Sequence, residues 1–258
     1  MTASEQRRVT RAGWLTAAIL SLLPLRATAT PSTVFWTPCS TDIQEWRTVH
    51  LTYDTYFTLG RKSPASGGAA FPVDLGLTLG ILPSEKIRAE AGFDWLEPSD
   101  FPLVFNAKAG FPEGALFKGA PALEAGIFNV GTGRGSTGVN AVDLVTGKSL
   151  PRGLGRIHLG IYTGSKALLA GSSGRTENTG FMAAFDIPLL PSPSPGEAFH
   201  QLVLAADWMS GRNALGGGGF GVGWYLSKDV SVLTGPAWFN DPGINGDWLY
   251  SFQLDANL

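Results

Sequence analysis

Residues 73–95 read VDLGLTLGILPSEKIRAEAGFDW, and this stretch decides the fold. Apolar side chains alternate with polar residues or glycine over residues 73–81 and again over residues 87–95. This period of two is typical of a β-strand with one apolar face. The short polar link between the two runs, residues 83–86, is typical of a turn. The stretch therefore predicts a β-hairpin with one apolar face and one face of polar residues and glycine.

The same alternation recurs along the chain from residue 49 to the C-terminus. We expect strands near residues 49–57, 73–81, 87–95, 103–111, 123–127, 139–146, 157–161, 181–187, 202–208, 220–226, 230–239 and 248–258. The run at 139–146 is faint, and Gly235-Pro236 interrupts the run at 230–239, so its faces stay unassigned. Tight turns alternate with longer loops rich in Gly, Ser and Asn. This order predicts an all-β, transmembrane, antiparallel up-and-down β-barrel of about 12 strands, with both termini at the tight-turn rim.

One connection at the tight-turn rim is unusual, because Pro191, Pro193 and Pro195 fall within five residues. Such a run could be a linker between two domains. The alternation resumes directly on both sides of it, which favours a single barrel over residues 45–258.

Composition narrows the class of protein. Only 16% of the 258 residues are charged, against about 25% in ordinary soluble domains. The formal net charge of −2 offers no basic face for a nucleic acid. Cys39 is the single cysteine, which excludes a disulfide framework and a cysteine zinc site. No motif indicates a cofactor.

The first 29 residues have the features of an export signal. Arg7, Arg8 and Arg11 precede an apolar run at residues 14–25, and Ala27-Thr28-Ala29 is typical of a cleavage site. We expect a signal peptide at 1–29, a periplasmic N-terminal segment at 30–44 and an outer-membrane barrel at 45–258. Cleavage would remove four of the 19 basic residues and one of the 21 acidic residues, which leaves a net charge of −5.

Alternation alone does not say which face of the barrel looks outward, but the chemistry of the two faces does. The polar face carries many glycines, such as Gly76, Gly92 and Gly221, and glycine is a poor residue for the exterior of a strand. The apolar face carries no charge in the strands whose faces can be assigned. Because a charge in mid-bilayer costs roughly 2–4 kcal/mol, we expect the apolar face to contact lipid and the polar face to line the lumen.

Residues 45–258 resemble bacterial outer-membrane β-barrel proteins. The most specific part is the closing strand, where apolar residues alternate to the end of the chain and Tyr250 and Phe252 stand in the aromatic rows. The chain ends in Leu258, where this class usually ends in Phe. The resemblance implies recognition of the C-terminal strand by the barrel-assembly machinery. Ala205-Ala206-Asp207, followed by residues 210–214, is similar to an uncharacterised porin-like family of exported barrels and implies no particular activity.

The alternation also predicts which side chains line a pore. The expected residues are His50, Asp54, Asp74, Arg88, Glu90, Asp94, Lys108, Glu124, Asp143, His158, Asp186, Asp207, Gln253 and Asp255. Arg156 has the same parity. Acidic side chains outnumber basic ones in this set, and acidic lumens favour cations.

Several motifs suggest other chemistry, and for each an ordinary structural role is the favoured interpretation. Residues 216–221 satisfy G-x-G-x-x-G but open a strand, and residues 133–138 form a glycine-rich loop without the lysine of a phosphate loop. Residues 241–247 offer oxygen ligands for Ca²⁺, yet the same residue types make turns. Closure of the barrel brings Gln253 or Asp255 near His50 at the tight-turn rim, with Ser251 on the same face, and a hydrogen bond at this seam is the favoured interpretation. A catalytic triad is the less favoured alternative there, because Ser251 and Asp255 are about 13 Å apart along the strand.

The sequence therefore predicts a narrow porin-like channel for small polar solutes or cations in the outer membrane of a Gram-negative bacterium. We expect no catalytic residue and no metal site. The alternatives are a barrel enzyme acting on lipid or lipopolysaccharide and a structural or surface-interaction barrel. The expected partners are outer-membrane lipid, the barrel-assembly machinery and small polar solutes or cations, with no nucleic acid.

Overall fold

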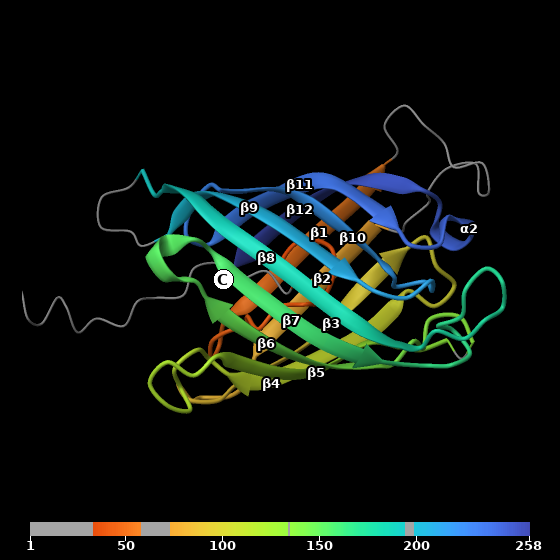
Figure 1. The fold of residues 1–258 in the computed structure, drawn as a ribbon, viewed down its shortest axis with the longest axis horizontal. Coiled ribbons are helices and arrows are strands. Elements are labelled where there is room, and N and C mark those ends of the chain that lie inside the picture. The colour runs from red at the N-terminus through yellow and green to blue at the C-terminus, as the bar shows by residue number, and fades with distance from the viewer. Residues whose placement is uncertain (1–32, 58–72, 134, 194–198) are drawn as a thin grey trace, which may run out of the picture.

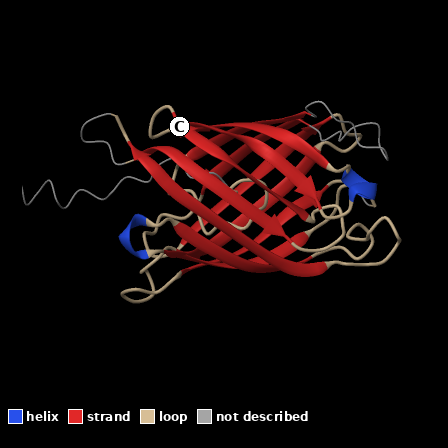
Figure 2. Ribbon diagram, turned by 45° about the horizontal axis from the view of Figure 1, so that its top comes forward, coloured by secondary structure: helices blue, strands red, loops and turns tan. Residues whose placement is uncertain are grey.

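The computed structural model describes residues 33–57, 73–133, 135–193 and 199–258. The predicted signal peptide at 1–29 lies outside these ranges. The described chain forms a closed barrel of antiparallel strands, each hydrogen-bonded to its neighbours in sequence, and the first strand closes on the last (Figure 1). The strands run obliquely to the long axis of the barrel (Figure 2). No helix in the described ranges is both long enough and apolar enough to cross a membrane.

The strands are β1 Val49–Phe57, β2 Val73–Gly80, β3 Arg88–Glu97, β4 Leu103–Phe111, β5 Ala122–Gly131, β6 Ala141–Ser149, β7 Arg156–Thr163, β8 Thr179–Pro191, β9 His200–Met209, β10 Gly217–Tyr225, β11 Val230–Phe239 and β12 Trp248–Asn257. A short 3₁₀ turn, η1 (Pro151–Gly153), and a short helix, α2 (Pro242–Asn245), lie in connections. The prediction of an all-β antiparallel barrel with 12 strands is confirmed.

Two strands differ in detail from the sequence prediction. β8 continues through Pro188 to Pro191 and pairs with β9 to its end, with register shifts near Leu190. The start of the proline run is therefore part of the sheet. β11 is continuous through Gly235-Pro236, and Pro236 pairs with Tyr250 of β12.

The outer surface of the barrel is apolar and its inner surface is mainly polar. Large apolar side chains such as Leu75, Leu159 and Phe181 are exposed on the outside, with 49%, 52% and 68% of their surface accessible. Charged side chains of the opposite parity, such as Glu90 and Glu124, are buried. The assignment of the apolar face to the exterior is confirmed.

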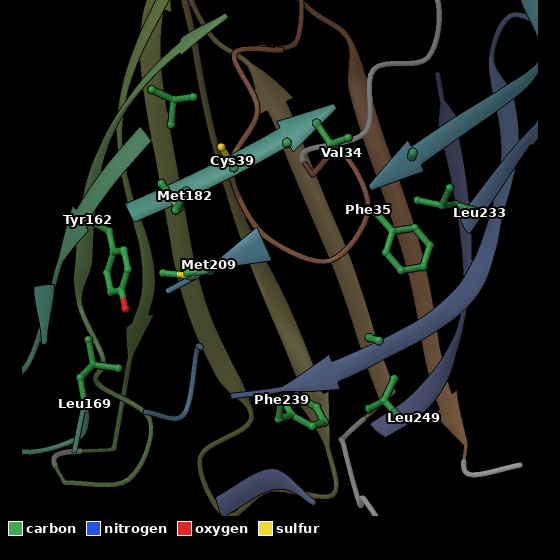
Figure 3. Packing of buried hydrophobic residues seen from close by; sticks show 14 residues of the cluster. Val34, Phe35, Cys39, Tyr162, Leu169, Met182, Met209, Leu233, Phe239 and Leu249 are labelled. Atoms are coloured by element: carbon green, nitrogen blue, oxygen red, sulfur yellow. The ribbon is translucent and has the colours of Figure 1, made fainter. Parts of the chain in front are cut away.

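The N-terminal segment, residues 33–47, lies inside the barrel, where the sequence analysis expects a periplasmic segment over residues 30–44. Phe35, Cys39 and Ser40 have no accessible surface. Val34, Phe35 and Cys39 pack in one cluster with Met182, Met209, Leu233 and Phe239 of the barrel wall (Figure 3). The hydrophobic core of this barrel is thus built around a segment within its lumen.

Glycines on the inner wall make room for this segment. A Cβ atom at Gly219 or Gly221 would overlap the ring of Phe35, and one at Gly80 would overlap the carbonyl oxygen of Glu45. Glycine removes the side chain at these points, so the two backbones can approach closely. The position of the segment therefore explains several of the inward glycines that the sequence places on the polar face.

Inward apolar residues also explain why the faces of β11 could not be predicted. Leu233, Ala237 and Phe239 point inward and are buried. Phe239 meets the ring of Trp36 edge-on, with 5.7 Å between the ring centroids. Both faces of β11 are therefore largely apolar, and the period-two contrast disappears.

Candidate functional site: the barrel lumen

The structure places the predicted pore-lining side chains on the inner face of the barrel. His50, Glu90, Glu124, His158, Asp186, Asp207, Gln253 and Asp255 are buried, and Asp54, Asp74, Arg88, Asp94, Lys108 and Asp143 are half-buried. They come from β1–β9 and β12, so the lumen carries charge around much of its circumference. Many of these residues hold the N-terminal segment.

Asp207 of β9 is the main anchor for the tip of the segment. Its Oδ2 atom accepts hydrogen bonds from three successive backbone N–H groups, those of Phe35 at 2.9 Å, Trp36 at 2.7 Å and Thr37 at 2.8 Å. Such a row of N–H groups is a concave anion-binding nest. Gln253 adds a fourth contact by donating from Nε2 to the carbonyl oxygen of Phe35 at 2.9 Å.

A charged network holds the middle of the segment. The Arg156 guanidinium donates to both carboxylate oxygens of Asp42 at 2.7 and 2.9 Å, and its Nε donates to Asp186 at 3.0 Å. His158 lies 3.3 Å from the Thr41 hydroxyl and 3.6 Å from Asp186. These contacts tie residues 41 and 42 to β7 and β8.

The pKa of Asp42 reflects this network. Burial by itself raises the pKa of a carboxyl, but the charge and hydrogen bonds of Arg156 outweigh burial and lower the pKa of Asp42 to about 2. A carboxyl whose pKa falls on folding stabilises the folded state above its unfolded pKa of about 3.9. That contribution disappears only as the pH falls to about 2, so the pair persists at ordinary pH.

The end of the segment is tied to β2 and β3, and the backbone N–H of Arg47 donates to the carbonyl oxygen of Gly80 in β2 at 3.0 Å. Arg88 pairs with Glu45 at 2.7 Å, and the backbone N–H of Gln44 donates to Glu90 at 2.6 Å. Lys108 lies 3.6 Å from Glu90. The three basic side chains of the predicted lumen set, Arg88, Lys108 and Arg156, are therefore all engaged with carboxylates.

His50 lies at the seam between β1 and β12, where the sequence predicts a hydrogen bond. Its Nδ1 is 2.7 Å from Asn257 Oδ1 and its Nε2 is 3.3 Å from Asp255 Oδ1. Ser251 is opposite Tyr56 in the register and accepts a hydrogen bond from Gln253. The serine is thus six register positions from His50, and these three residues do not form a catalytic triad.

Substantial cavities remain beside the N-terminal segment. One of about 310 Å³ is lined by residues of the segment and by Asp54, Asp74, Asp94, Glu124 and Asp143. A second, of about 410 Å³, lies toward the tight-turn rim, and Thr33 and Asp255 line both. A third, of about 180 Å³, is bordered by the Asp42–Arg156 pair. The segment narrows the lumen and leaves polar space on more than one side.

The other candidate motifs have structural roles. Asp241 caps the N-terminus of α2, and its carboxylate accepts hydrogen bonds from Gly243 and Ser172, as expected for a turn. The glycine run at 216–221 enters β10. No group of three His, Cys, Asp or Glu side chains in the described part of the chain has the spacing of a metal site.

Comparison with known proteins connects the chain to porins through the fold alone. No protein-family model and no curated protein matches the sequence. Among solved structures, the KdgM porin superposes with a TM-score of 0.52 at 7% sequence identity, covering 82% of this chain and 99% of that chain. An outer membrane channel from Pseudomonas putida F1 gives a TM-score of 0.47 at 12% identity, covering 89% and 99% of the two chains. The chain therefore shares the barrel fold of the KdgM porin.

The residues that sequence analysis missed all belong to the N-terminal segment. Asp42 and Glu45 supply the partners of Arg156 and Arg88, and Phe35 fills the space above two glycines. One signal was available, since Val34, Phe35 and Trp36 are three successive large apolar residues in a segment expected to face water. These three residues are far in sequence from the strands that they contact, so the sequence alone does not show which wall residues are their partners.

Proposed function

We propose that this protein is a porin-like channel in the outer membrane of a Gram-negative bacterium, conducting small polar solutes and cations. The observation that carries the proposal is the closed strand ladder, apolar outside and charged inside. A closed barrel leaves no strand edge unpaired, so it satisfies its backbone hydrogen bonds in lipid. A charged interior within such a barrel provides a polar route across the bilayer.

The exterior of the barrel is suited to outer-membrane lipid. Exposed aromatic side chains cluster toward the rim with the longer loops, where Phe57 contacts Tyr250 and Phe220 contacts Trp238. Aromatic girdles of this kind mark the membrane interface in outer-membrane barrels. The alternation in β12 supports recognition by the barrel-assembly machinery. Short turns face the periplasm in this class, so the rim from which residues 33–47 enter the lumen would open to the periplasm.

The N-terminal segment makes the channel narrow. Val49 and Leu258 exchange backbone hydrogen bonds at the tight-turn rim, so residues 33–47 reach the lumen from that rim. Three side chains of the barrel wall hold the segment at successive points along it: Asp207 binds Trp36, Arg156 binds Asp42 and Glu90 binds Gln44. Conduction then follows the polar cavities beside the segment, and loosening the segment widens the path.

Planar-bilayer recording of the mature protein, residues 30–258, tests this proposal. We expect discrete conductance steps, and larger steps from Asp207→Ala, because that substitution removes the acceptor of three backbone N–H groups. Asp100→Ala, in the exposed loop after β3, serves as the matched control and should leave the step size unchanged. Folded protein that inserts but passes no current in either form would refute the channel.

A further inference from the structure

Asp54 and Asp74 form an acidic pair on the inner wall, and they stand directly opposite each other in the pairing of β1 and β2. Each has a buried Oδ1 atom that accepts no hydrogen bond from the described residues. Neither carboxylate forms a salt bridge within that part of the chain. Tyr56 donates to Oδ2 of Asp54 at 3.2 Å, a contact that satisfies one oxygen only. Because like charges directly opposite on a sheet destabilise it, this pair favours a cationic partner.

The basic side chains of the predicted lumen set are engaged elsewhere. Arg88 and Arg156 bind carboxylates of the N-terminal segment. Lys108 lies 3.6 Å from Glu90 and also attracts the carboxylates of β5 and β6 that share its cavity. A cation for the Asp54–Asp74 pair would therefore come from outside the residues that the structure describes.

The N-terminal segment brings its own beginning close to this pair. Gln253 donates from Nε2 to the carbonyl oxygen of Phe35 at 2.9 Å, and Gln253 is the register partner of Asp54 across the β1–β12 seam. Thr33, two residues before Phe35, lines the same cavity of about 310 Å³ as Asp54 and Asp74. The first described residue of the segment thus borders the space into which the acidic pair faces.

The predicted cleavage site lies only three residues before Thr33. Residues 30–32, which lie outside the described residues, can span at most about 10 Å. Thr33 and Asp255 border both of the larger cavities. Asp54 is a diagonal neighbour of Asp255 in the pairing of β1 and β12, a separation of roughly 7–8 Å. Cleavage after Ala29 therefore creates an α-ammonium group within reach of the acidic pair.

We propose that the α-ammonium group of Thr30, created by signal-peptide cleavage, binds the Asp54–Asp74 pair and anchors the start of the N-terminal segment in the lumen. Hydrolysis of the Ala29–Thr30 peptide bond by water turns an uncharged amide nitrogen into an amine, which takes up a proton. The uncleaved chain lacks this charge, so processing itself completes the lumen. Such a contact goes beyond the proposed function and rests on the predicted cleavage site. One ammonium offsets one negative charge, so Asp54, Asp74 and Asp94 together remain negative.

The rate at which an activated ester acylates the N-terminal amine of the folded protein, residues 30–258 in detergent, tests this contact without requiring conduction. Near pH 7 such a reagent selects the α-amine over lysine side chains, and mass spectrometry of the N-terminal peptide follows the reaction. We expect acylation at least about tenfold slower than in the free peptide of residues 30–38, because only the neutral amine reacts and the carboxylates favour the ammonium. The double variant Asp54→Asn, Asp74→Asn should restore the fast rate. Glu124→Gln, the same change of carboxyl to amide beside Lys108 in that cavity, is the matched control and should stay slow.

Acylation of the unmodified protein as fast as that of the free peptide, or a rate that stays slow in the double variant, would overturn the contact. A protein that reaches the outer membrane with residues 1–29 still attached would overturn it as well. A protected amine in a protein that passes no current would refute the channel and leave this contact standing, and conduction with a fully reactive amine would do the reverse. The double variant should fold, as gel mobility would show, because it removes unpaired charge and keeps the side-chain shape.

Discussion

Gly219 and Phe35 illustrate how the lumen depends on single residues. The ring of Phe35 occupies the place where a side chain at position 219 would begin. Gly223 lies four residues further along β10, on the same face. A Cβ atom added there would lie 3.5 Å or more from its nearest neighbouring atoms, which is ordinary van der Waals contact. The two glycines look alike in the sequence, yet only the first is needed for the N-terminal segment.

Cys39 provides a direct probe of that difference. The thiol is fully buried, and burial followed by the charge of Asp207 raises its pKa, so it stays protonated and unreactive. We predict that Gly219→Ala displaces Phe35 and increases the rate of maleimide labelling of Cys39 about tenfold, since overpacking costs roughly 1–3 kcal/mol. Gly223→Ala should label as slowly as the unmodified protein. Rapid labelling of the unmodified protein would show that the segment lies outside the lumen.

The strands themselves were the most predictable part of the molecule. The local alternation of apolar and polar residues identified all of them and assigned the apolar side to the exterior. It could do so because successive side chains of a strand point to opposite faces of the sheet. The faces of β11 could not be assigned in this way, because its inward residues Leu233 and Phe239 are apolar like its outward ones. Their partners are in residues 34–39, about 200 positions earlier in the chain. No periodicity links segments so far apart, and the buried N-terminal segment escaped prediction for the same reason.

β2 offers a test of the two faces within one element. Leu77→Arg places a charge on the outer face near the middle of the strand and should destabilise the inserted barrel by about 2–4 kcal/mol. Asp74→Arg places the same side chain on the inner face beside Asp54, where it should insert normally. Refolding into lipid vesicles, with the folded fraction measured by gel mobility without boiling, distinguishes the two. Equal insertion of both variants would contradict the assignment of faces.

The whole barrel carries an excess of negative charge toward its lumen. Arg88, Lys108 and Arg156 are each engaged with carboxylates, two of them with Asp42 and Glu45 of the N-terminal segment. The N-terminal segment therefore supplies carboxylates to two of the basic residues. Asp54, Asp74 and Asp94 form no salt bridge within the described part of the chain. A low-dielectric wall focuses the field of such charges on passing ions.

The reversal potential in a KCl gradient across a planar bilayer tests the central claim most directly. A conducting lumen with unneutralised acids should favour K⁺ over Cl⁻, and the preference should weaken at high salt, where the screening length falls to about 3 Å at 1 M. The triple variant Asp54→Asn, Asp74→Asn and Asp94→Asn should shift the reversal potential toward zero. Cation preference in the unmodified protein that falls in this variant is the predicted result, and anion preference in the unmodified protein would contradict the account.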